Sequence, residues 1–322
     1  MPVYNCANYI TKSIESVLNQ TYEKFELLII NDGSTDGTIE QLKFYEAKDN
    51  RIRIYHQKNQ GIVSALNKGI NLAKGKYIAR IDADDIMNKK RLSEQINILE
   101  LKDNIAVLGS WITVINEKGE SINNWELPFQ PIEFDFWTYL NGDVRVGHPC
   151  VTYRTDVVRF LGGYRDNYPH AEDIDLWFRI EQSGFEILNI PKYLTLYRKH
   201  NSQITNKYRE LSTQSYHKAL SDFLSNRLKC DIDSEKAALF IPSNYTNIYF
   251  NNQDKIDLLY NLKYQMFRIF VVKNNLTKLE VIKYAYKLWL SLFPVCRLQV
   301  AKFHKTIIQN TTLSFKLILR SF

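Results

Sequence analysis

Short apolar segments alternate with helical patterns along the first half of the chain. Residues 25–30, 51–55 and 76–81 are rich in Ile, Leu and Tyr and predict three strands. Between the second and the third, residues 61–73 place their apolar side chains at the spacing of one helix face. Strands that alternate with helices in this way are typical of an α/β domain built on a mainly parallel sheet.

The second half of the chain changes from this mixed pattern to a helical one. Residues 172–182 predict a helix, and residues 185–190 and 194–197 predict two further strands. No strand-like alternation follows Ile204, so we expect an α/β domain over residues 1–204 and a helical extension over residues 205–322. A length of 322 residues with 45% hydrophobic content is enough for one such core and an appendage.

Composition excludes several classes of protein. The four cysteines lie far apart, so neither a zinc cluster nor a disulfide framework is expected. The first residues show no basic segment followed by an apolar one, which argues against a signal peptide. Apolar runs are all too short for a membrane-spanning helix. These features predict a reducing, cytoplasmic setting.

The net charge of +7 belongs to the end of the chain. Residues 263–322 carry eleven Lys and Arg and one acidic residue, Glu280, with aromatic and aliphatic residues between them. This pattern suits the surface of an anionic membrane, and it equally suits a helical appendage with a solvated basic face. Nucleic acid is not an expected partner, because no nucleic-acid-binding module accompanies the charge.

Polar residues stand at the ends of two predicted strands. Residues 31–34 (Asn-Asp-Gly-Ser) follow the first strand, and residues 82–85 (Asp-Ala-Asp-Asp) follow the third. Ligands of open parallel sheets bind beyond the carboxyl ends of the strands, so both segments are expected to border one crevice.

Three aspartates, Asp82, Asp84 and Asp85, lie within four residues. Their mutual repulsion is tolerable if a divalent cation such as Mn²⁺ or Mg²⁺ lies among them and bridges to diphosphate oxygens. His200, just after the last predicted strand, could complete the ligand shell begun by Asp84. The alternative is a solvated loop in which an Asp caps a helix beginning near Asn88.

Asp32 and Gly33 allow two interpretations as well. The carboxylate could accept hydrogen bonds from a base or a ribose, and the glycine would let the backbone approach a ligand closely. An ordinary Asx-turn uses the same residue types.

Glu172 and Asp173 open the predicted helix over 172–182. One of them could be a general base that takes a proton from an attacking hydroxyl. Acidic residues in a first helical turn also interact favourably with the helix dipole without any chemistry. His148 is a further candidate, although a single histidine is more often a structural hydrogen-bonding residue.

Taken in order, these segments resemble glycosyltransferase family 2, a group of inverting enzymes with the GT-A fold. The resemblance covers about 200 residues and is carried by residues 2–5, 16–22, 31–36, 59–61, 65–67, 73–78, 80–85, 162–164 and 172–177. It implies a Rossmann-like, mainly parallel central sheet flanked by helices. It also implies transfer of a sugar from a nucleotide-diphosphate sugar, with a UDP-sugar expected, to an acceptor hydroxyl.

The resemblance also implies roles for individual residues. Asp173 matches the general base, with Glu172 beside it shaping the acceptor pocket. Asp84 and His200 match positions that bind Mn²⁺ or Mg²⁺. The nucleotide-sugar donor is expected to be bound by residues of the other matching segments: Pro2, Val3, Tyr4, Asn5, Asp32, Gly61, Asn67, Arg80, Asp82 and Ala83.

The chain also departs from the pattern of the family. Relatives usually have an apolar first strand before Pro2, so we expect either a start upstream of Met1 or a truncated sheet. Asn31 stands where relatives often carry a second aspartate. A bacterial enzyme of surface polysaccharide or lipid-linked glycan synthesis, at the inner face of the membrane, is the expectation that these features favour.

Two other functions remain open on the sequence. A sugar-phosphate nucleotidyltransferase would need a glycine-rich loop after its first strand, and no glycine precedes Gly33. An inactive, truncated binding or scaffold protein would explain the missing strand, whereas the presence of Asp82, Asp84 and Asp173 argues against it.

Overall fold

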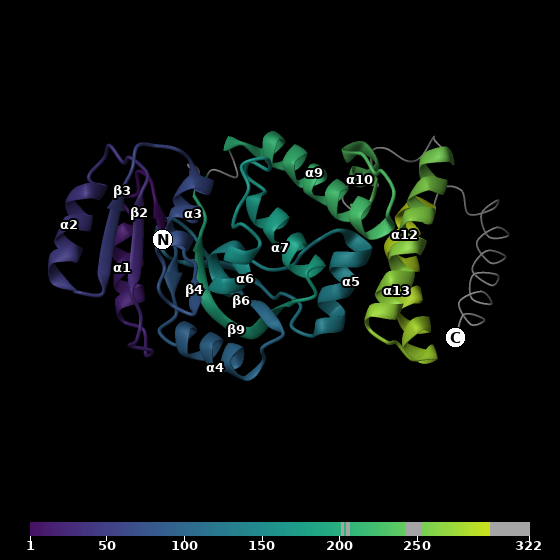
Figure 1. The fold of residues 1–322 in the computed structure, drawn as a ribbon, viewed down its shortest axis with the longest axis horizontal. Helices are drawn as coiled ribbons and strands as arrows, with labels where there is room; N and C mark the ends of the chain where they lie inside the picture. Colours follow the sequence, from purple (N-terminus) through teal and green to yellow (C-terminus); the bar gives the residue numbers. More distant parts are fainter. Residues whose placement is uncertain (201–202, 204–206, 242–252, 297–322) are drawn as a thin grey trace. The chain divides into compact units, whose positions relative to one another are not determined.

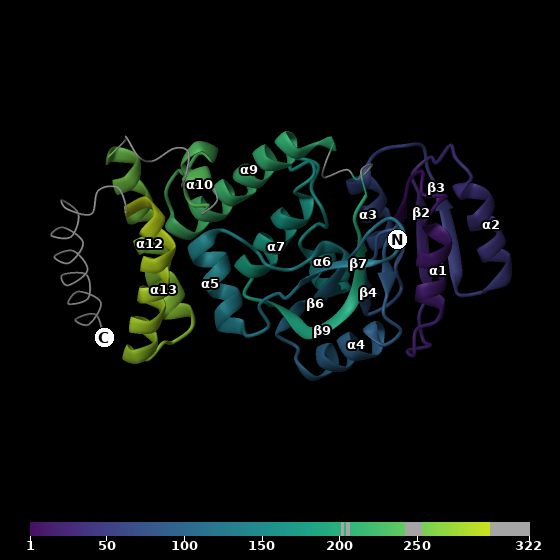
Figure 2. The ribbon, with the colours of Figure 1, turned by 180° about the vertical axis from the view of Figure 1, so that it is seen from behind.

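The computed structural model describes residues 1–200, 203, 207–241 and 253–296. Figures 1 and 2 show the chain from two opposite sides. It forms two compact units, Met1–Thr138 with Val144–Ser234 and Tyr139–Asp143 with Glu235–Phe322. All of the candidate site residues belong to the first unit.

The first sheet of this unit has three parallel strands in the order β1-β2-β3. They are β1 (Pro2–Val3), β2 (Leu27–Asn31) and β3 (Ile52–His56). The helices that follow them are α1 (Ile10–Leu18), α2 (Thr38–Lys48) and α3 (Ile62–Leu72). The strands predicted over 25–30 and 51–55 and the helix predicted over 61–73 are therefore confirmed to within a residue or two.

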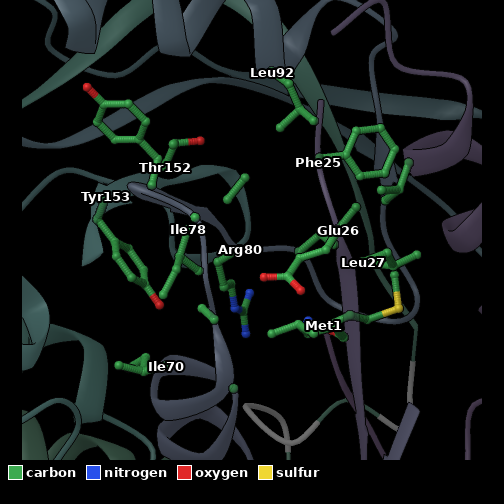
Figure 3. Close-up of a pocket in the computed structure, with 18 of the residues that line it drawn as sticks. Met1, Phe25, Glu26, Leu27, Ile70, Ile78, Arg80, Leu92, Thr152 and Tyr153 are labelled. Atoms are coloured by element: carbon green, nitrogen blue, oxygen red, sulfur yellow. Dashed lines mark hydrogen bonds between the residues drawn. The ribbon is translucent and has the colours of Figure 1, made fainter. Parts of the chain in front are cut away.

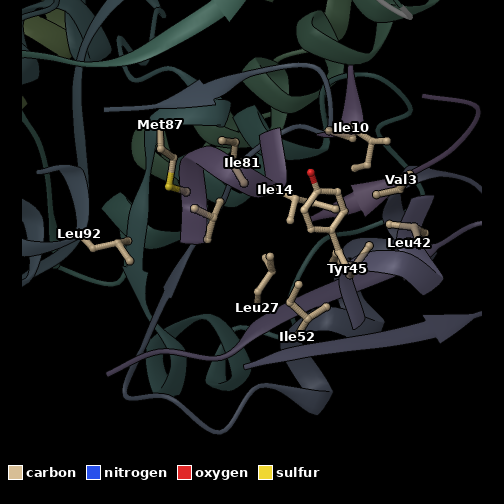
Figure 4. Close-up of a cluster of buried hydrophobic side chains, with 13 residues drawn as sticks. Val3, Ile10, Ile14, Leu27, Leu42, Tyr45, Ile52, Ile81, Met87 and Leu92 are labelled. Carbon is tan, nitrogen blue, oxygen red and sulfur yellow. The ribbon is translucent and has the colours of Figure 1, made fainter. Parts of the chain in front are cut away.

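Apolar side chains between this sheet and α1 form a core, which Figure 4 shows. Helix α1 contributes Ile10, Ile14 and Val17, which recur at helical spacing and are buried. They pack against strand residues such as Leu27 and Ile52. Burial of this face, rather than helix propensity, is what stabilises a nine-residue helix.

The second sheet is mixed, in the order β4-β8-β6-β9-β5, with β7 paired to β6. Only β6 and β9 run parallel, and the other pairs are antiparallel. The GT-A-like α/β architecture is confirmed, with parallel pairs throughout the first sheet and between β6 and β9 in the second. The strands of the second sheet are β4 (Tyr77–Ala79), β5 (Ile86–Met87), β6 (Ile105–Ile115), β7 (Ser121–Trp125), β8 (Thr152–Arg154) and β9 (Glu186–Arg198).

Strand β9 replaces the two strands predicted over 185–190 and 194–197. The prediction of two strands was wrong because Pro191 does not end the strand. Pairing with β6 runs from Ser110↔Ile190 directly to Trp111↔Tyr193, so a bulge absorbs Pro191 and Lys192. A bulge leaves a residue outside the ladder, which suits a proline that has no N–H to donate.

The remaining helices of the first unit surround this sheet. They are α4 (Arg91–Leu101), α6 (Thr155–Phe160), α7 (Glu172–Gln182) and α9 (Arg209–Leu228), with a 3-10 turn, η1 (His148–Cys150). Helix α7 has the bounds that the sequence predicts. Figure 1 shows α9 beside α7, and the rings of Phe178 and Phe223 stack at 4.4 Å between them. This packing places α9 in the first compact unit, beyond the boundary expected after residue 204.

The second unit consists of helices in its described part. Helix α5 (Pro131–Asn141) ends in it, α10 (Ser234–Leu239) begins at its boundary, and α12 (Gln253–Lys273) and α13 (Lys278–Cys296) follow. Lys263 of α12 is buried, and its Nζ donates to the carbonyls of Leu140 and Phe240. Among the described residues, none of the helices is long and apolar enough to span a bilayer.

A cavity of about 250 Å³ lies between the edges of the two sheets. Figure 3 shows Leu27 of β2, Ile78 of β4 and Met1 around it. The Met1 amine donates to the carbonyl of Leu28 at 2.9 Å, and burial lowers its pKa to about 5. Strand β1 pairs only with Ile30 and Asn31, so the cavity borders the part of β2 that precedes them.

Candidate active site

The candidate donor-binding residues lie where β1, β2 and β4 end. Tyr4 and Asn5 follow β1, and the Tyr4 side chain is 51% exposed. Asn5 adopts a left-handed φ of 47° and accepts a hydrogen bond from the Thr35 amide at 2.7 Å. The backbone amide of Asn5 donates to Ser34 Oγ at 3.0 Å. These contacts join the loops after β1 and β2 into one surface.

Other residues predicted to bind the donor are buried instead. Pro2 is buried, and the side chains of Val3 and Ala83 belong to the apolar core. Asn67 pairs with the backbone of Tyr164, since its Nδ2 donates to the carbonyl at 2.8 Å and its Oδ1 accepts from the amide at 2.9 Å. The side chains of these four residues therefore hold the site together, and any donor contact is left to their neighbours or their backbone.

Asp32 is anchored by three hydrogen bonds to the loop before α3. Its Oδ1 accepts from Gln57 Nε2 and from the Gln60 amide, and its Oδ2 accepts from the Gly61 amide, all at 2.8 Å. A Cβ atom at Gly33 would lie 2.8 Å from the Asn59 nitrogen, so this loop needs a glycine beside Asp32. The carboxylate thus shapes the loop before α3, and its role in donor binding stays a prediction.

Arg80, which is buried, and the partly buried Asp82 form an ion pair directly after β4. The guanidinium nitrogens Nη1 and Nη2 each lie 2.5 Å from an oxygen of Asp82, and Arg80 is only 6% exposed. Burial raises the pKa of Asp82, although Arg80 opposes the shift. Because both of its oxygens are engaged with Arg80, Asp82 is less available to a cation than Asp84 is.

Asp84 and His200 converge from the ends of β4 and β9. His200 Nε2 lies 2.8 Å from Asp84 Oδ2, although the residues are far apart in the chain. Oxygens of Asp82, Asp84 and Asp85 also lie within 4.8 Å of one another. One carboxylate oxygen of Asp85 is buried and has no hydrogen-bond partner among the described residues. Oxygen and imidazole ligands grouped in this way fit a Mn²⁺ or Mg²⁺ ion.

Glu172 and Asp173 lie in the first turn of α7. Glu172 is 6% exposed, and burial together with the charge of Asp173 raises its pKa to about 7. Burial also raises the pKa of Asp173, whose Oδ1 accepts from the Ile174 amide at 2.9 Å. The charges of Arg80 and Asp82 act on the pKa of Asp173, so the end of β4 and the start of α7 share one electrostatic environment.

His148, treated above as a structural candidate, lies beside Asp173. Its Nδ1 is 3.9 Å from Asp173 Oδ2, and its Nε2 is 2.8 Å from the Tyr164 hydroxyl. Burial and the charge of Arg80 hold the pKa of His148 well below its usual range. The imidazole is therefore neutral at physiological pH.

Arg91 is a supporting residue that sequence reasoning missed. It is fully buried, and its guanidinium donates to the carbonyls of Arg80 at 2.7 Å, Pro149 at 2.9 Å and Val151 at 2.9 Å. It thereby links the end of β4 to the turn that carries His148. The basic residues at the start of α4 give no sign of this role in the sequence. The three carbonyls that Arg91 binds belong to two segments that meet α4 only in the fold.

Comparison with known proteins identifies the family. The model of "Glycosyl transferase family 2" matches residues 1–160. The O-antigen biosynthesis glycosyltransferase WbnJ of Escherichia coli is 34% identical over 232 residues, which cover 71% of this chain and 87% of WbnJ. The chain belongs to glycosyltransferase family 2. As a family 2 member it is an enzyme, and the predictions of family and enzyme class are confirmed.

Other members and a solved structure extend the comparison. An uncharacterized glycosyltransferase of Haemophilus influenzae is 34% identical over 218 residues, 64% of this chain and 66% of that protein, so the match spans just under two thirds of the relative's length. The structure of S. aureus TarS 1-349 in complex with UDP-GlcNAc has a TM-score of 0.56 at 17% identity and covers 83% of this chain and 79% of that chain. At this identity the likeness to TarS concerns the fold.

Proposed function

We propose that this family 2 enzyme transfers a sugar from a nucleotide-diphosphate sugar, a UDP-sugar, to an acceptor hydroxyl with inversion, and that Asp173 is the general base. The observation that carries this proposal is the position of Asp173. Its carboxylate stands at the start of α7, beside neutral His148 and in the electrostatic field of Arg80 and Asp82. A base is thus adjacent to the strand end expected to bind the donor.

The proposed reaction is a single displacement. The acceptor oxygen bonds to the anomeric carbon, and its proton passes to a carboxylate oxygen of Asp173. The bond from the anomeric carbon to the diphosphate oxygen breaks, and the nucleoside diphosphate leaves with the bonding electrons. A carboxylate whose pKa burial has raised is a better proton acceptor than a solvated one, which suits this role.

Asp84 and His200 are the residues proposed to hold a Mn²⁺ or Mg²⁺ ion, which would stabilise negative charge on the departing diphosphate. Arg198 supports this pair, since its Nε donates to the Asp84 carbonyl at 2.9 Å. Tyr9 packs its ring 5.1 Å from the His200 ring. These contacts hold the Asp84 backbone and the His200 ring in place.

The acceptor is proposed to be a glycan or a lipid-linked glycan of bacterial surface polysaccharide synthesis. The O-antigen role in the name of WbnJ supports this choice, and the UDP-GlcNAc complex of TarS supports a UDP-sugar donor. A peripheral position at the inner face of the cell membrane would bring the enzyme to such an acceptor.

The second unit is the part proposed to contact an anionic membrane. On α13, Leu279 and Ile282 are 77% and 48% exposed, next to exposed Lys283. The opposite face of α13 is buried through Val281 and Tyr284. Exposed apolar side chains of this kind can enter a lipid interface, and the neighbouring lysine can contact anionic headgroups. Residues 297–322, the rest of the basic segment, lie outside the described residues.

Activity assays with Asp173→Asn test the central proposal. Hydrolysis and transfer from UDP-GlcNAc, UDP-glucose, UDP-galactose and GDP-mannose are measured with Mn²⁺, and the anomeric configuration of the product is determined by NMR. The proposal expects an inverted product and a loss of about 10²-fold or more in kcat for Asp173→Asn. Unchanged activity in this variant would remove the base assignment. A wild-type protein that turns over none of these donors would favour the inactive binding or scaffold protein.

Liposome co-sedimentation tests the membrane surface. Leu279→Ser combined with Ile282→Ser is expected to reduce binding to vesicles of anionic phospholipid. Leu101→Ser is the matched control, since Leu101 is 84% exposed on α4 of the other unit. Equal binding by the double variant and the control contradicts the proposal, and binding to RNA in place of vesicles would assign the charge to nucleic acid.

A further inference from the structure

Tyr164, His148 and Asp173 form a row from three separate segments. Tyr164 lies in the loop after α6, His148 in η1 and Asp173 in α7. The Tyr164 hydroxyl is 2.8 Å from His148 Nε2, and His148 Nδ1 faces Asp173 Oδ2 at 3.9 Å. The His148 ring also packs edge-on against the ring of Trp177, with 6.0 Å between the ring centroids, and this contact restricts rotation of the imidazole.

Protonation decides what each nitrogen of His148 can do. A neutral imidazole has one N–H and one lone pair. Tyr164 is buried and its pKa is raised well above the usual value, so the phenol keeps its proton and can donate it to Nε2. We therefore assign the N–H of His148 to Nδ1, the atom that faces Asp173.

We propose that His148 is a positioning residue for glycosyl transfer, whose Nδ1–H orients the Asp173 carboxylate toward the acceptor hydroxyl. This inference rests on the proposed role of Asp173 as the base. The Asp173 Oδ1 is already held by the Ile174 amide, so a second donor at Oδ2 would fix the plane of the carboxylate. The distance of 3.9 Å exceeds a hydrogen bond, so the proposal requires the Asp173 carboxylate to turn toward Nδ1 when substrates bind.

Other ionisable groups around Asp173 also affect the pKa of its carboxylate. Arg80 favours the anion of Asp173, whereas Asp82 and the neighbouring Glu172 oppose it. The phenol of Tyr153 is hydrogen-bonded to that of Tyr164 and also keeps its proton, since burial raises its pKa to about 12, so it can donate to the Tyr164 oxygen while Tyr164 donates to His148. Removing the Nδ1–H donor would leave Asp173 with less support for its anion, so activity should require a higher pH.

Two substitutions of His148 separate the two ring nitrogens. His148→Asn keeps an N–H donor near the position of Nδ1, and His148→Gln keeps a polar group near Nε2 instead. We expect His148→Gln to reduce kcat about tenfold to a hundredfold with donor KM within about twofold. In this variant, the pH below which kcat falls should rise by about one unit. His148→Asn should retain most of the activity, and Tyr164→Phe should show the shift of His148→Gln in weaker form.

The measurement is hydrolysis of UDP-GlcNAc with Mn²⁺ across the pH range, or of whichever sugar nucleotide tested above is turned over fastest. His217→Gln on α9 is the matched histidine control and should behave as wild type. If Asp173→Asn is inactive and both His148 variants match wild type, this inference is wrong while the proposed function stands. Equal losses in both His148 variants with lowered Tm would show a structural role and also overturn it. An active Asp173→Asn would remove both proposals.

Discussion

His200 Nε2 lies 2.8 Å from Asp84 Oδ2, across a separation of 116 residues. Asp84 follows β4, and His200 follows β9, the strand that pairs with β5 beside the aspartate loop. The contact between β5 and β9 is what brings the two residues together. Sequence spacing alone could not show this, because the pairing partner of β9 is fixed only in the folded sheet.

Substitution at this pair should weaken cation binding directly. We expect Asp84→Asn to reduce the affinity for Mn²⁺ about a hundredfold and His200→Asn about tenfold, because each removes a ligand of the proposed site. Calorimetric titration of the protein with Mn²⁺ measures this without activity. Asp103→Asn is the control, since Asp103 is 94% exposed. Wild-type affinity in Asp84→Asn would place the cation elsewhere.

Glu172 should make stability fall with rising pH. Its pKa rises from 4.5 in the unfolded chain to about 7 in the fold, so the folded state binds the proton more tightly. The stability that this preference contributes is present below pH 4.5 and is lost as the pH rises through 7. Across this pH range, the shift changes the free energy of unfolding by on the order of 3 kcal/mol.

Glu172→Gln removes this titration. Urea unfolding at a pH near 5 and a pH near 8 should show a smaller decline for the variant than for wild type. Glu120→Gln, in the exposed turn before β7, serves as the control. An identical pH dependence in wild type and Glu172→Gln would show that Glu172 keeps an ordinary pKa in the fold.

The strands and the acidic residues of the site could be predicted from the sequence because they depend on local pattern. Apolar runs ending in Asp32 and in Asp82 mark the carboxyl ends of strands, and those ends meet in α/β folds. Helix α7 was predicted with its observed bounds, since Glu172 and Asp173 open a regular amphipathic pattern. The roles of the individual residues came from the family resemblance and remain proposals.

What could not be predicted depends on contacts between distant segments. Asn67 looked like a donor ligand, yet both of its amide atoms pair with the Tyr164 backbone. The sequence suggests a strand boundary at Pro191, yet a bulge in β9 places Pro191 outside the ladder with β6. His148 carries no local signal for its place beside Asp173, because η1 and α7 are adjacent only in the fold.

Arg91 is expected to be essential for stability. Its guanidinium is the donor for carbonyls of Arg80, Pro149 and Val151, and Arg91→Met would leave them buried without that donor. The expected loss is on the order of 3 kcal/mol or more in the free energy of unfolding, measured with urea. The neighbouring Lys90 is exposed, so Lys90→Met should change it by less than about 0.5 kcal/mol. Equal effects at the two positions would contradict the structural role of Arg91.

The cavity beside Met1 predicts that a short apolar strand fused before this residue stabilises the protein. The cavity of about 250 Å³ is lined by Leu27 of β2 and by Ile78 of β4, which stands at the edge of the second sheet. The fusion also replaces the buried Met1 amine by an amide that can still donate to the Leu28 carbonyl. We expect Tm to rise by several degrees, since filled volume and new backbone pairs both favour the folded state.

A pH series separates filling of the cavity from a general effect of added residues. The Met1 amine has a pKa lowered from 8.0 to about 5, so it takes up a proton more readily in the unfolded chain. The stability of a chain expressed from Met1 should therefore fall as the pH decreases from 8 toward 5, and the fused form should lose this dependence. A Gly-Ser extension of equal length should also lose the dependence, because its amine lies away from the cavity, yet it should not raise Tm at high pH. If the apolar and Gly-Ser extensions melt at the same temperature, the cavity does not accept a strand.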